Sequence, residues 1–415
     1  MNIVFIITSY WAYGELSIAC EFALRIKQMG GTPYFVIPPS HRKSMEFNHF
    51  PFITLIPRNR VVNILLLKDI EIRLKPEMVI LADFLNYNFC EQHYGLLPED
   101  LTIFSGKLGT FDDFDWTITG NRMDTYGFRS KKYGDIDIRN YGFGLCPCPV
   151  VNPLNGAREH TYHYKLIDKK IRYHIERTNQ YKKELGLPTN RKLILFTSAL
   201  WQDQYKKYPD VMDFVEVNQR IFWHMMEELS KDYTILCIGN ESYYNKESNH
   251  ILFLNSLPPQ VFDQYLLACD LYLSRNLIST SLARAVVSGI PSVCIQNSYS
   301  FHKIGKEETS YLDFIPDDVV FDSLSQLKRS YKYRMFPVGW HYFLEVLCKG
   351  NPYMDSFYQV EQYKVKESLD QIHFLLNSGN AVDELRNNTE SYNQLLDHLP
   401  SVESIILHII QGVNA

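Results

Sequence analysis

The sequence predicts an α/β protein with two doubly wound domains, each a parallel sheet covered by helices on both faces. Two observations predict this fold class. Short apolar runs alternate with longer segments of helical character, which is typical of parallel sheets. The candidate strands of the first half are 2–8, 33–37, 52–56, 78–82 and 101–104. The pattern then restarts, because the run 192–198 repeats the character of 4–9, an apolar strand that ends in Thr-Ser.

The clearest helix of the first half spans 15–29. Gly30 and Gly31 end it, as glycines often do at helix C-termini. One apolar stripe at helical spacing predicts the face that it buries, with Ile18, Phe22, Ala23, Ile26 and Met29.

After the restart, the same alternation continues to residue 295. We expect helices at 216–230, 258–268 and 280–288, and strands at 233–238, 251–254, 270–274 and 292–295. The charged segment that follows the first half has helical spacing and stops before Pro188, so we interpret it as a solvated linking helix. The expected domains are therefore 1–163, the linking helix 164–188, a second domain 189–375 and C-terminal helices over 376–415.

Composition excludes several classes of function. Lys and Arg number 42 against 47 Asp and Glu, a net charge of −5, so no basic excess is present to bind nucleic acid. No stretch approaches the ~18 to 20 apolar residues of a membrane span, and no basic region precedes the apolar N-terminal run. The eight cysteines are scattered, and the close pair Cys146 and Cys148 has no second pair to complete a zinc set. We expect a soluble cytoplasmic protein without a metal or cofactor; its oligomeric state stays open.

The loop after the strand 270–274 predicts a phosphate site. The strand ends at Ser274, and Ser279 or Thr280 is placed to cap the next helix. Free N–H groups and the positive end of that helix then face the carboxyl edge of the sheet, where ligands of open parallel sheets bind.

These residues resemble the donor-binding half of GT-B glycosyltransferases. The small and hydroxyl residues at 279–281 and the turn Gly289-Ile290-Pro291 match that family's pattern, clearly over 190–298 and more loosely over 1–110. The resemblance implies two Rossmann-like domains that face a cleft, and metal-independent transfer (EC 2.4). Arg284 departs from the pattern, because many families have a ribose-binding Glu there; it either contacts phosphate or is a solvated helix residue. The implied donor-phosphate ligands are Ser198, Arg275, Ser279, Thr280, Ser281 and Lys303.

Carboxylates of the first half are the candidates for acid–base chemistry. In GT-B enzymes the loop after the first strand borders the acceptor, and here it holds Gly14 and Glu15 where many members have Gly-His. Glu15 is either a base or a first-turn carboxylate that the helix dipole favours. Asp83, at the end of the strand 78–82, is either a general base or a helix N-cap.

An acidic, aromatic segment lies at 111–126. Its carboxylates and rings suit a cationic or polyhydroxylated acceptor, with Asp113 as a further catalytic candidate, although a solvated acidic loop explains them equally. The acceptor-binding candidates are Gly14, Asp112, Asp115, Trp116 and Asp124.

The resulting hypothesis is a glycosyltransferase with small-molecule partners. It moves a hexosyl or phosphoribosyl group from a nucleotide sugar or phosphoribosyl diphosphate to a small acceptor. The acidic segment makes it similar to atypical transferases, including phosphoribosyltransferases, of aminoglycoside antibiotic biosynthesis. Two alternatives stay open: a sugar-nucleotide epimerase of the same fold, and a non-catalytic scaffold or binding protein.

Overall fold

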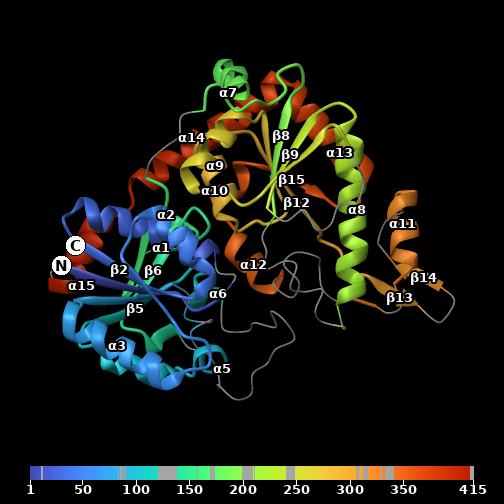
Figure 1. The fold of residues 1–415 in the computed structure, drawn as a ribbon. Coiled ribbons are helices and arrows are strands. Elements are labelled where there is room, and N and C mark those ends of the chain that lie inside the picture. The colour runs from blue at the N-terminus through green and yellow to red at the C-terminus, as the bar shows by residue number, and fades with distance from the viewer. Residues whose placement is uncertain are drawn as a thin grey trace.

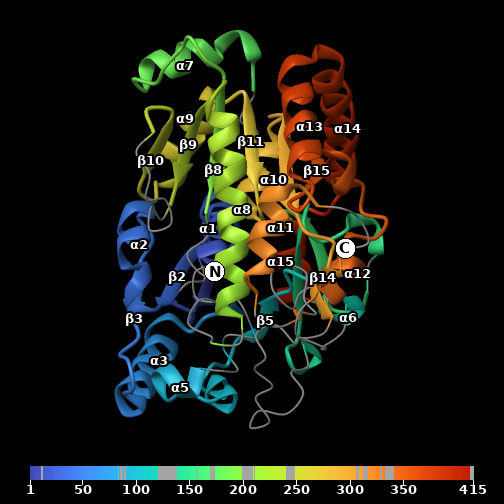
Figure 2. The same cartoon turned by 90° about the vertical axis from the view of Figure 1, so that its right-hand side faces the viewer.

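The computed structural model describes most of the chain. The described residues are 1–10, 13–82, 84, 87, 90–119, 138–156, 158–168, 173–198, 209, 211–239, 248–304, 308–311, 316–327, 330–331 and 341–411. They form two parallel sheets, one in each half, with a small hairpin beside the second (Figure 1). In Figure 2 the two halves lie one above the other, with α3 and α5 at one end and α7 at the other.

The first domain contains a seven-stranded sheet in the order β3-β2-β1-β4-β5-β6-β7, parallel throughout. Its strands are β1 (Asn2–Ile6), β2 (Thr32–Ile37), β3 (Phe52–Thr54), β4 (Met78–Leu81), β5 (Lys107–Phe111), β6 (Gly144–Cys148) and β7 (Thr161–Lys165). Its helices are α1 (Tyr13–Gln28), α2 (Arg42–Asn48), α3 (Arg60–Leu74), α5 (Cys90–Tyr94) and α6 (Trp116–Thr119).

The second domain contains a six-stranded parallel sheet in the order β10-β9-β8-β11-β12-β15. Its strands are β8 (Leu193–Thr197), β9 (Thr234–Ile238), β10 (Ile251–Leu254), β11 (Leu271–Ser274), β12 (Ser292–Gln296) and β15 (Tyr358–Glu361), and the hairpin is β13 (His302–Ile304) with β14 (Glu308–Tyr311). The helices of this half are α7 (Thr178–Glu184), α8 (Met212–Ser230), α9 (Pro259–Ala268), α10 (Thr280–Val287), α11 (Asp318–Ser325), α12 (His341–Cys348) and α13 (Val365–Asn377). Short 3-10 helices lie at 39–41, 98–103, 138–140, 153–155, 175–177 and 352–355.

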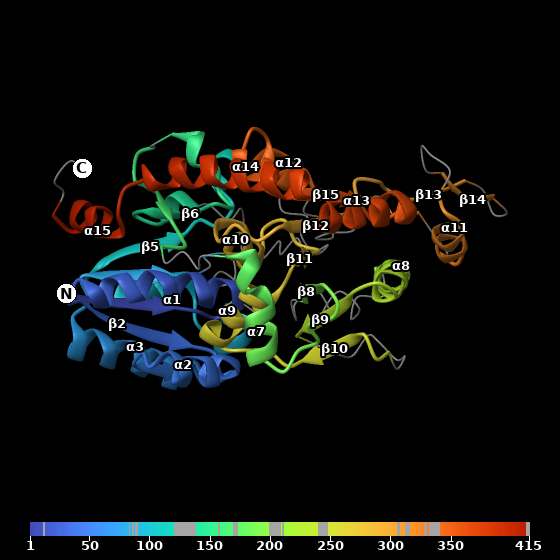
Figure 3. The ribbon, with the colours of Figure 1, turned by 90° about the horizontal axis from the view of Figure 1, so that it is seen from above.

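The C-terminal helices return the chain to the first domain. Figure 3 shows α14 (Gly379–Asp397) continuing from α13 toward α15 (Val402–Gln411). Helix α14 contacts α10 and β7, and α15 packs on α1. One apolar cluster accordingly runs through both domains, from Phe22 on α1 to Leu282 and Ala285 on α10 and Ile406 on α15.

Buried strands explain why the sheets form where the apolar runs predict them. In β1, Ile3 and Phe5 belong to one apolar cluster and Val4 and Ile6 to another, so both faces of the strand are covered. Such burial is typical of parallel sheets with helices on both faces.

Two expected elements differ from the structure. The run 101–104 does not form a strand, because Pro98 starts a 3-10 helix over Pro98–Ile103 in which the Asp100 carboxylate accepts a hydrogen bond from Leu97 N–H; β5 follows instead. The segment 164–188 is not one solvated helix. It begins inside β7 with the buried Tyr164, and within the described residues 164–168 and 173–188 the α-helix is confined to Thr178–Glu184.

Candidate functional site

The loop between β11 and α10 has a tightly specified conformation at the carboxyl edge of the second sheet. The Ser274 hydroxyl accepts a hydrogen bond from Asn276 N–H (3.0 Å) and donates one to the Asn276 carbonyl (3.1 Å). The side-chain oxygen of Asn276 accepts from Ile278 N–H at 3.0 Å. Ser279 Oγ accepts from Leu282 N–H at 3.3 Å, which makes Ser279 the N-cap of α10 and confirms one of the two predicted caps.

Hydroxyl groups connect the start of α10 to the sheet below it. The buried Tyr272 on β11 lies with its hydroxyl 2.5 Å from Thr197 Oγ1, at the end of β8. Burial raises the pKa of Tyr272, and hydrogen bonds with Thr197, Ser281 and Ser279 oppose that rise. The phenol is neutral, so these groups add no negative charge beneath the positive end of α10.

The loops after β8 and β9 lie close together at the same edge of the sheet. Gly239, after β9, has a φ of 132°, and a Cβ atom there would lie 2.5 Å from Ser198 Oγ and 2.9 Å from the Ser198 carbonyl oxygen. Ser198 N–H in turn donates to the Ile238 carbonyl at 3.1 Å. Glycine is therefore required for the loops after β8 and β9 to approach this closely.

Arg275 lies at the same edge, and its side chain contacts other residues of the second domain. Its guanidinium carbon is 4.4 Å from the centre of the Phe222 ring, and Nη2 is 3.4 Å from Gln362 Oε1. The side chain is buried. Lys303 lies in β13, and its side chain is outside the described residues.

Three residues of the acidic segment after β5 are shielded from solvent. Asp112, Asp115 and Trp116 are buried. The Asp115 carboxylate accepts hydrogen bonds from Asn155 Nδ2 (2.8 Å), Thr117 Oγ1 (3.2 Å) and the Arg158 guanidinium, which also forms an ion pair with it. Contacts within the protein therefore occupy the Asp115 carboxylate, and burial shields Asp112 and Trp116, where the sequence predicts contacts with an acceptor.

Sequence reasoning missed the residues that complete this buried network. Cys146 on β6 and His163 on β7 are register partners, so their side chains leave the sheet on the same face. Burial lowers the pKa of His163, and Arg158 lowers it further while Asp115 raises it. Donor atoms of Asp112, Asp115 and Cys146 lie within 4.8 Å of one another, but Arg158 already supplies a cation to this group.

Apolar contacts bring the acidic segment and the α10 loop to one interdomain cluster. Phe114, from the acidic segment, and Ile278, from the α10 loop, both pack against Val150, Leu344 and Leu347. Helices α6 and α12 are in contact at the same place. The carboxyl edges of the two sheets therefore face the same region, as a cleft between the domains requires.

The remaining candidates of the first domain lie at or near its own carboxyl edge. Gly14 and Glu15 are half-buried in the first turn of α1, and Asp113 is half-buried after β5. Asp83 and Asp124 lie outside the described residues.

Arg284 differs from one of the two roles expected for it. It is not a solvated residue, because its side chain is only 12% exposed and forms ion pairs with Glu21 on α1 and Asp263 on α9. Both partners are carboxylates of the protein, and one of them belongs to the other domain.

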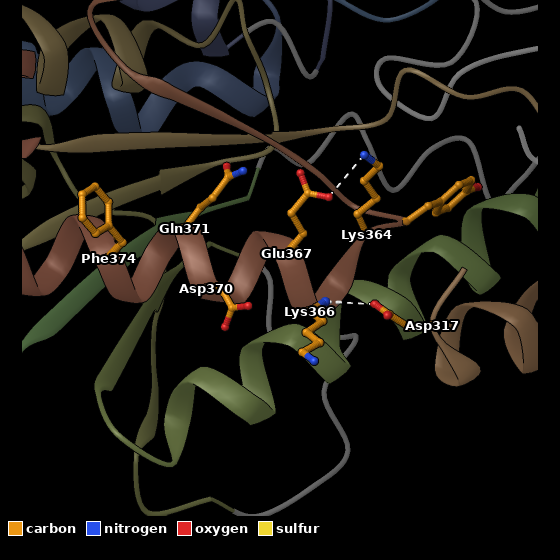
Figure 4. A pocket seen from close by; sticks show the side chains of 8 residues that line it. Asp317, Lys364, Lys366, Glu367, Asp370, Gln371 and Phe374 are labelled. Atoms are coloured by element: carbon orange, nitrogen blue, oxygen red, sulfur yellow. Dashed lines mark hydrogen bonds and ion pairs between the residues drawn. The ribbon is translucent and has the colours of Figure 1, made fainter. Parts of the chain in front are cut away.

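A separate open groove of about 600 Å³ lies along α13 (Figure 4). Asp317 accepts a hydrogen bond from Lys366 N–H at 2.9 Å on one side, and Lys364 pairs with Glu367 at 3.2 Å on the other. Lysines and carboxylates alternate there, so the groove presents no single charge to a ligand. It is lined by α13 and the residue before α11, and none of its lining residues belongs to α10.

No helix in the described ranges combines the length and apolar character needed to cross a bilayer. A family model described as "Family of unknown function (DUF6365)" matches residues 22–413. A search of curated protein sequences finds no match.

A comparison with solved structures finds proteins of low sequence identity whose folds match nearly the whole chain. The spinosyn forosaminyltransferase SpnP superposes with a TM-score of 0.56 at 9% identity, over 99% of this chain and 98% of that one. HepE from Anabaena, in complex with UDP and glucose, gives 0.54 at 12% identity and 99% of both chains. A putative UDP-N-acetylglucosamine 2-epimerase from Listeria monocytogenes gives 0.53 at 9% identity, over 100% and 97%. The neighbours include GT-B glycosyltransferases, and the predicted two-domain GT-B fold is confirmed.

Proposed function

We propose that this chain, which belongs to the DUF6365 family and has the GT-B fold, is a glycosyltransferase that uses a phosphate-activated sugar donor. The observation that carries the proposal is the start of α10. A serine-capped helix N-terminus lies at the carboxyl edge of the second sheet, and its loop packs on the same apolar cluster as the edge of the first sheet. Helix N-termini in this position bind phosphate.

In the proposed reaction the protein stabilises charge on the departing phosphate. The bond between the anomeric carbon and the donor phosphate oxygen breaks, and that carbon forms a bond to an acceptor oxygen or nitrogen. The phosphate takes the electron pair of the broken bond, where the N–H groups and hydroxyls of Thr280 and Ser281 meet it. Ser198 and Arg275 border the same site.

A carboxylate of the first domain takes the acceptor proton. Glu15 is our first choice, because it is half-buried in the first turn of α1, directly after the loop that follows β1 at the carboxyl edge of the first sheet. Asp113 and Asp83 are the alternatives. A small cationic acceptor, as in an aminoglycoside pathway, would be attracted by these carboxylates. Since Asp112 and Asp115 are buried, that attraction depends on fewer groups than the sequence suggests.

The neighbouring 2-epimerase motivates a second candidate, a sugar-nucleotide epimerase on the same donor site. The two candidates differ in whether an acceptor is consumed. An epimerase converts the donor sugar alone, whereas a transferase releases the donor's phosphate leaving group only with an acceptor or, slowly, with water.

A donor panel tests the proposed site. We would measure thermal shifts with UDP-, GDP- and dTDP-sugars and with phosphoribosyl diphosphate. A ligand at a hundredfold excess over its Kd should raise the Tm by roughly 3 °C. Ser279→Ala should abolish most of that shift, because it removes the cap that fixes the start of α10.

Ser378→Ala is the matched control for this experiment. Ser378 caps α14 by accepting from Ala381 N–H at 3.3 Å, the same geometry and distance as at Ser279. Each variant should lose about 1 kcal/mol of stability, but only Ser279→Ala should lose the donor shift. A wild-type protein that no donor stabilises, or equal donor shifts in the two variants, would contradict the proposed site.

A further inference from the structure

The side chain of Arg284 joins the two domains through the helix that starts the proposed phosphate site. Its Nη2 forms an ion pair with Glu21 Oε1 on α1 of the first domain. Its Nη1 lies 3.3 Å and 3.4 Å from the two carboxylate oxygens of Asp263 on α9 of its own domain. One guanidinium thus lies between two carboxylates, and one of these belongs to the opposite domain.

The three side chains are largely shielded from water. Arg284 is 12% exposed, Glu21 22% and Asp263 24%. Shielding strengthens the attraction between the ions and makes the loss of one partner more damaging than for a surface pair. Without Arg284, the carboxylates of Glu21 and Asp263 would lose the guanidinium that lies between them at the domain boundary.

The ion pair is close to both halves of the proposed site. Arg284 follows Thr280, the first residue of α10, by four positions, and Glu21 follows Glu15 by six. At a rise of 1.5 Å per residue these separations are roughly 6 Å and 9 Å along the helices. Helices α1 and α10 are in contact, so the pair fixes the start of one helix relative to the start of the other.

We propose that Arg284 is a positioning residue that holds the donor helix α10 in register with the acceptor-side helix α1. The inference depends on the proposed function, since it assigns the two helix starts to donor and acceptor. Arg284 does not touch the donor itself. Its contribution is geometric: it sets the distance between the phosphate at α10 and the carboxylate at α1, and a displacement of about 1 Å at a reacting centre costs up to 100-fold in rate.

The kinetic test uses two single variants and their charge swap. With the donor that gives the largest thermal shift, Glu21→Gln and Arg284→Met should each lower kcat at least tenfold, while the donor Kd changes less than threefold. The double variant E21Q/R284M should be no worse than the poorer single variant, since both remove one interaction. The swap E21R/R284E is made together with Asp263→Asn, because a carboxylate at position 284 would otherwise lie against that of Asp263. This variant keeps one interdomain ion pair, so it should recover most of the lost kcat.

Two kinetic results would overturn the inference. If both single variants keep the wild-type kcat, the pair does not position the site. If the donor Kd rises in parallel with the loss of kcat in Arg284→Met but not in Glu21→Gln, Arg284 contacts the donor directly.

Calorimetry tests the coupling without any substrate. The wild-type should unfold in one transition, and Glu21→Gln or Arg284→Met should separate the two domains into two transitions. Arg386→Met is the control, because Arg386 pairs with Asp383 within α14 and both are exposed. Unchanged transitions in both interdomain variants would overturn the coupling. An absence of wild-type turnover with split transitions would instead refute the proposed function and leave the coupling intact.

Discussion

Replacement of Asp112 by Asn should make the protein more stable above neutral pH. Asp112 follows β5 and is fully buried. Its Oδ1 accepts from Trp116 N–H at 2.9 Å, whereas Oδ2 has no hydrogen-bond partner within the described part of the chain. Burial raises the pKa of this carboxyl from 3.8 to about 7, and the Asp115 charge adds to the rise, while the Trp116 N–H and Arg158 oppose it.

The sign of the pH effect follows from proton binding. Between pH 3.8 and 7 the unfolded chain has lost this proton and the folded protein keeps it, so stability falls as the pH rises through that window. Each pKa unit is worth about 1.4 kcal/mol, and the three-unit difference gives a loss of at most about 4 kcal/mol. Asp112→Asn carries no titrating proton and keeps an oxygen for Trp116 N–H, so it avoids this loss.

Thermal unfolding at pH 4 and pH 8 checks the prediction. The Tm of the variant should match that of the wild-type at pH 4 and exceed it by up to roughly 5 °C at pH 8. Asp69→Asn is the control, because Asp69 is an exposed partner of Arg73 on α3. Its removal should change the Tm only slightly and by the same amount at pH 4 and pH 8. Parallel pH profiles for the wild-type and Asp112→Asn would refute the argument.

Two further substitutions test contacts at the two ends of the second sheet. Gly239→Ala should cost about 2 kcal/mol and weaken donor binding, since its Cβ would lie 2.5 Å from Ser198 Oγ at a positive φ. Gly379→Ala is the control, because a Cβ atom at Gly379 would meet nothing within 4 Å, so this variant should lose little stability and keep donor binding. Equal melting curves for the two variants would contradict this account. Lys182→Met should cost about 2 to 3 kcal/mol in urea unfolding, because it removes the buried ammonium group that lies 2.6 Å from the Asp270 carboxylate. Asp270 keeps its hydrogen bond from Leu193 N–H (2.6 Å) but loses its cation. Asp270→Asn in the same chain should recover part of that loss, and no recovery would show that packing rather than charge is responsible.

Much of the fold could be predicted because its central strands are continuous apolar runs. The strands around 4–6 and 193–197 are buried on both faces, so their sequences carry a strong local signal. The strands β6 and β7 gave no such signal. They contain Pro147 and His163, residue types that are uncommon inside a buried strand.

Within the candidate site, the sequence predicted the contact between residues that are close together in the chain. Ser279 caps a helix three residues away, and the sequence alone indicates that contact. The burial of Asp115 depends on Arg158, 43 residues later, and the role of Arg284 depends on Glu21, 263 residues earlier. Neither pairing can be predicted from the residues nearby in sequence. The acidic segment was therefore interpreted as either an acceptor surface or a solvated loop, and Arg284 as either a phosphate ligand or a solvated residue.

A crystal structure with the donor that gives the largest thermal shift tests the central claim most directly. The account predicts that a phosphate of the donor lies at the start of α10, with its oxygens about 2.7 to 3.2 Å from the N–H groups of Thr280 or Ser281. It also predicts that the sugar extends toward α1 of the first domain. A donor bound in the groove along α13, or a phosphate held without α10, would contradict it.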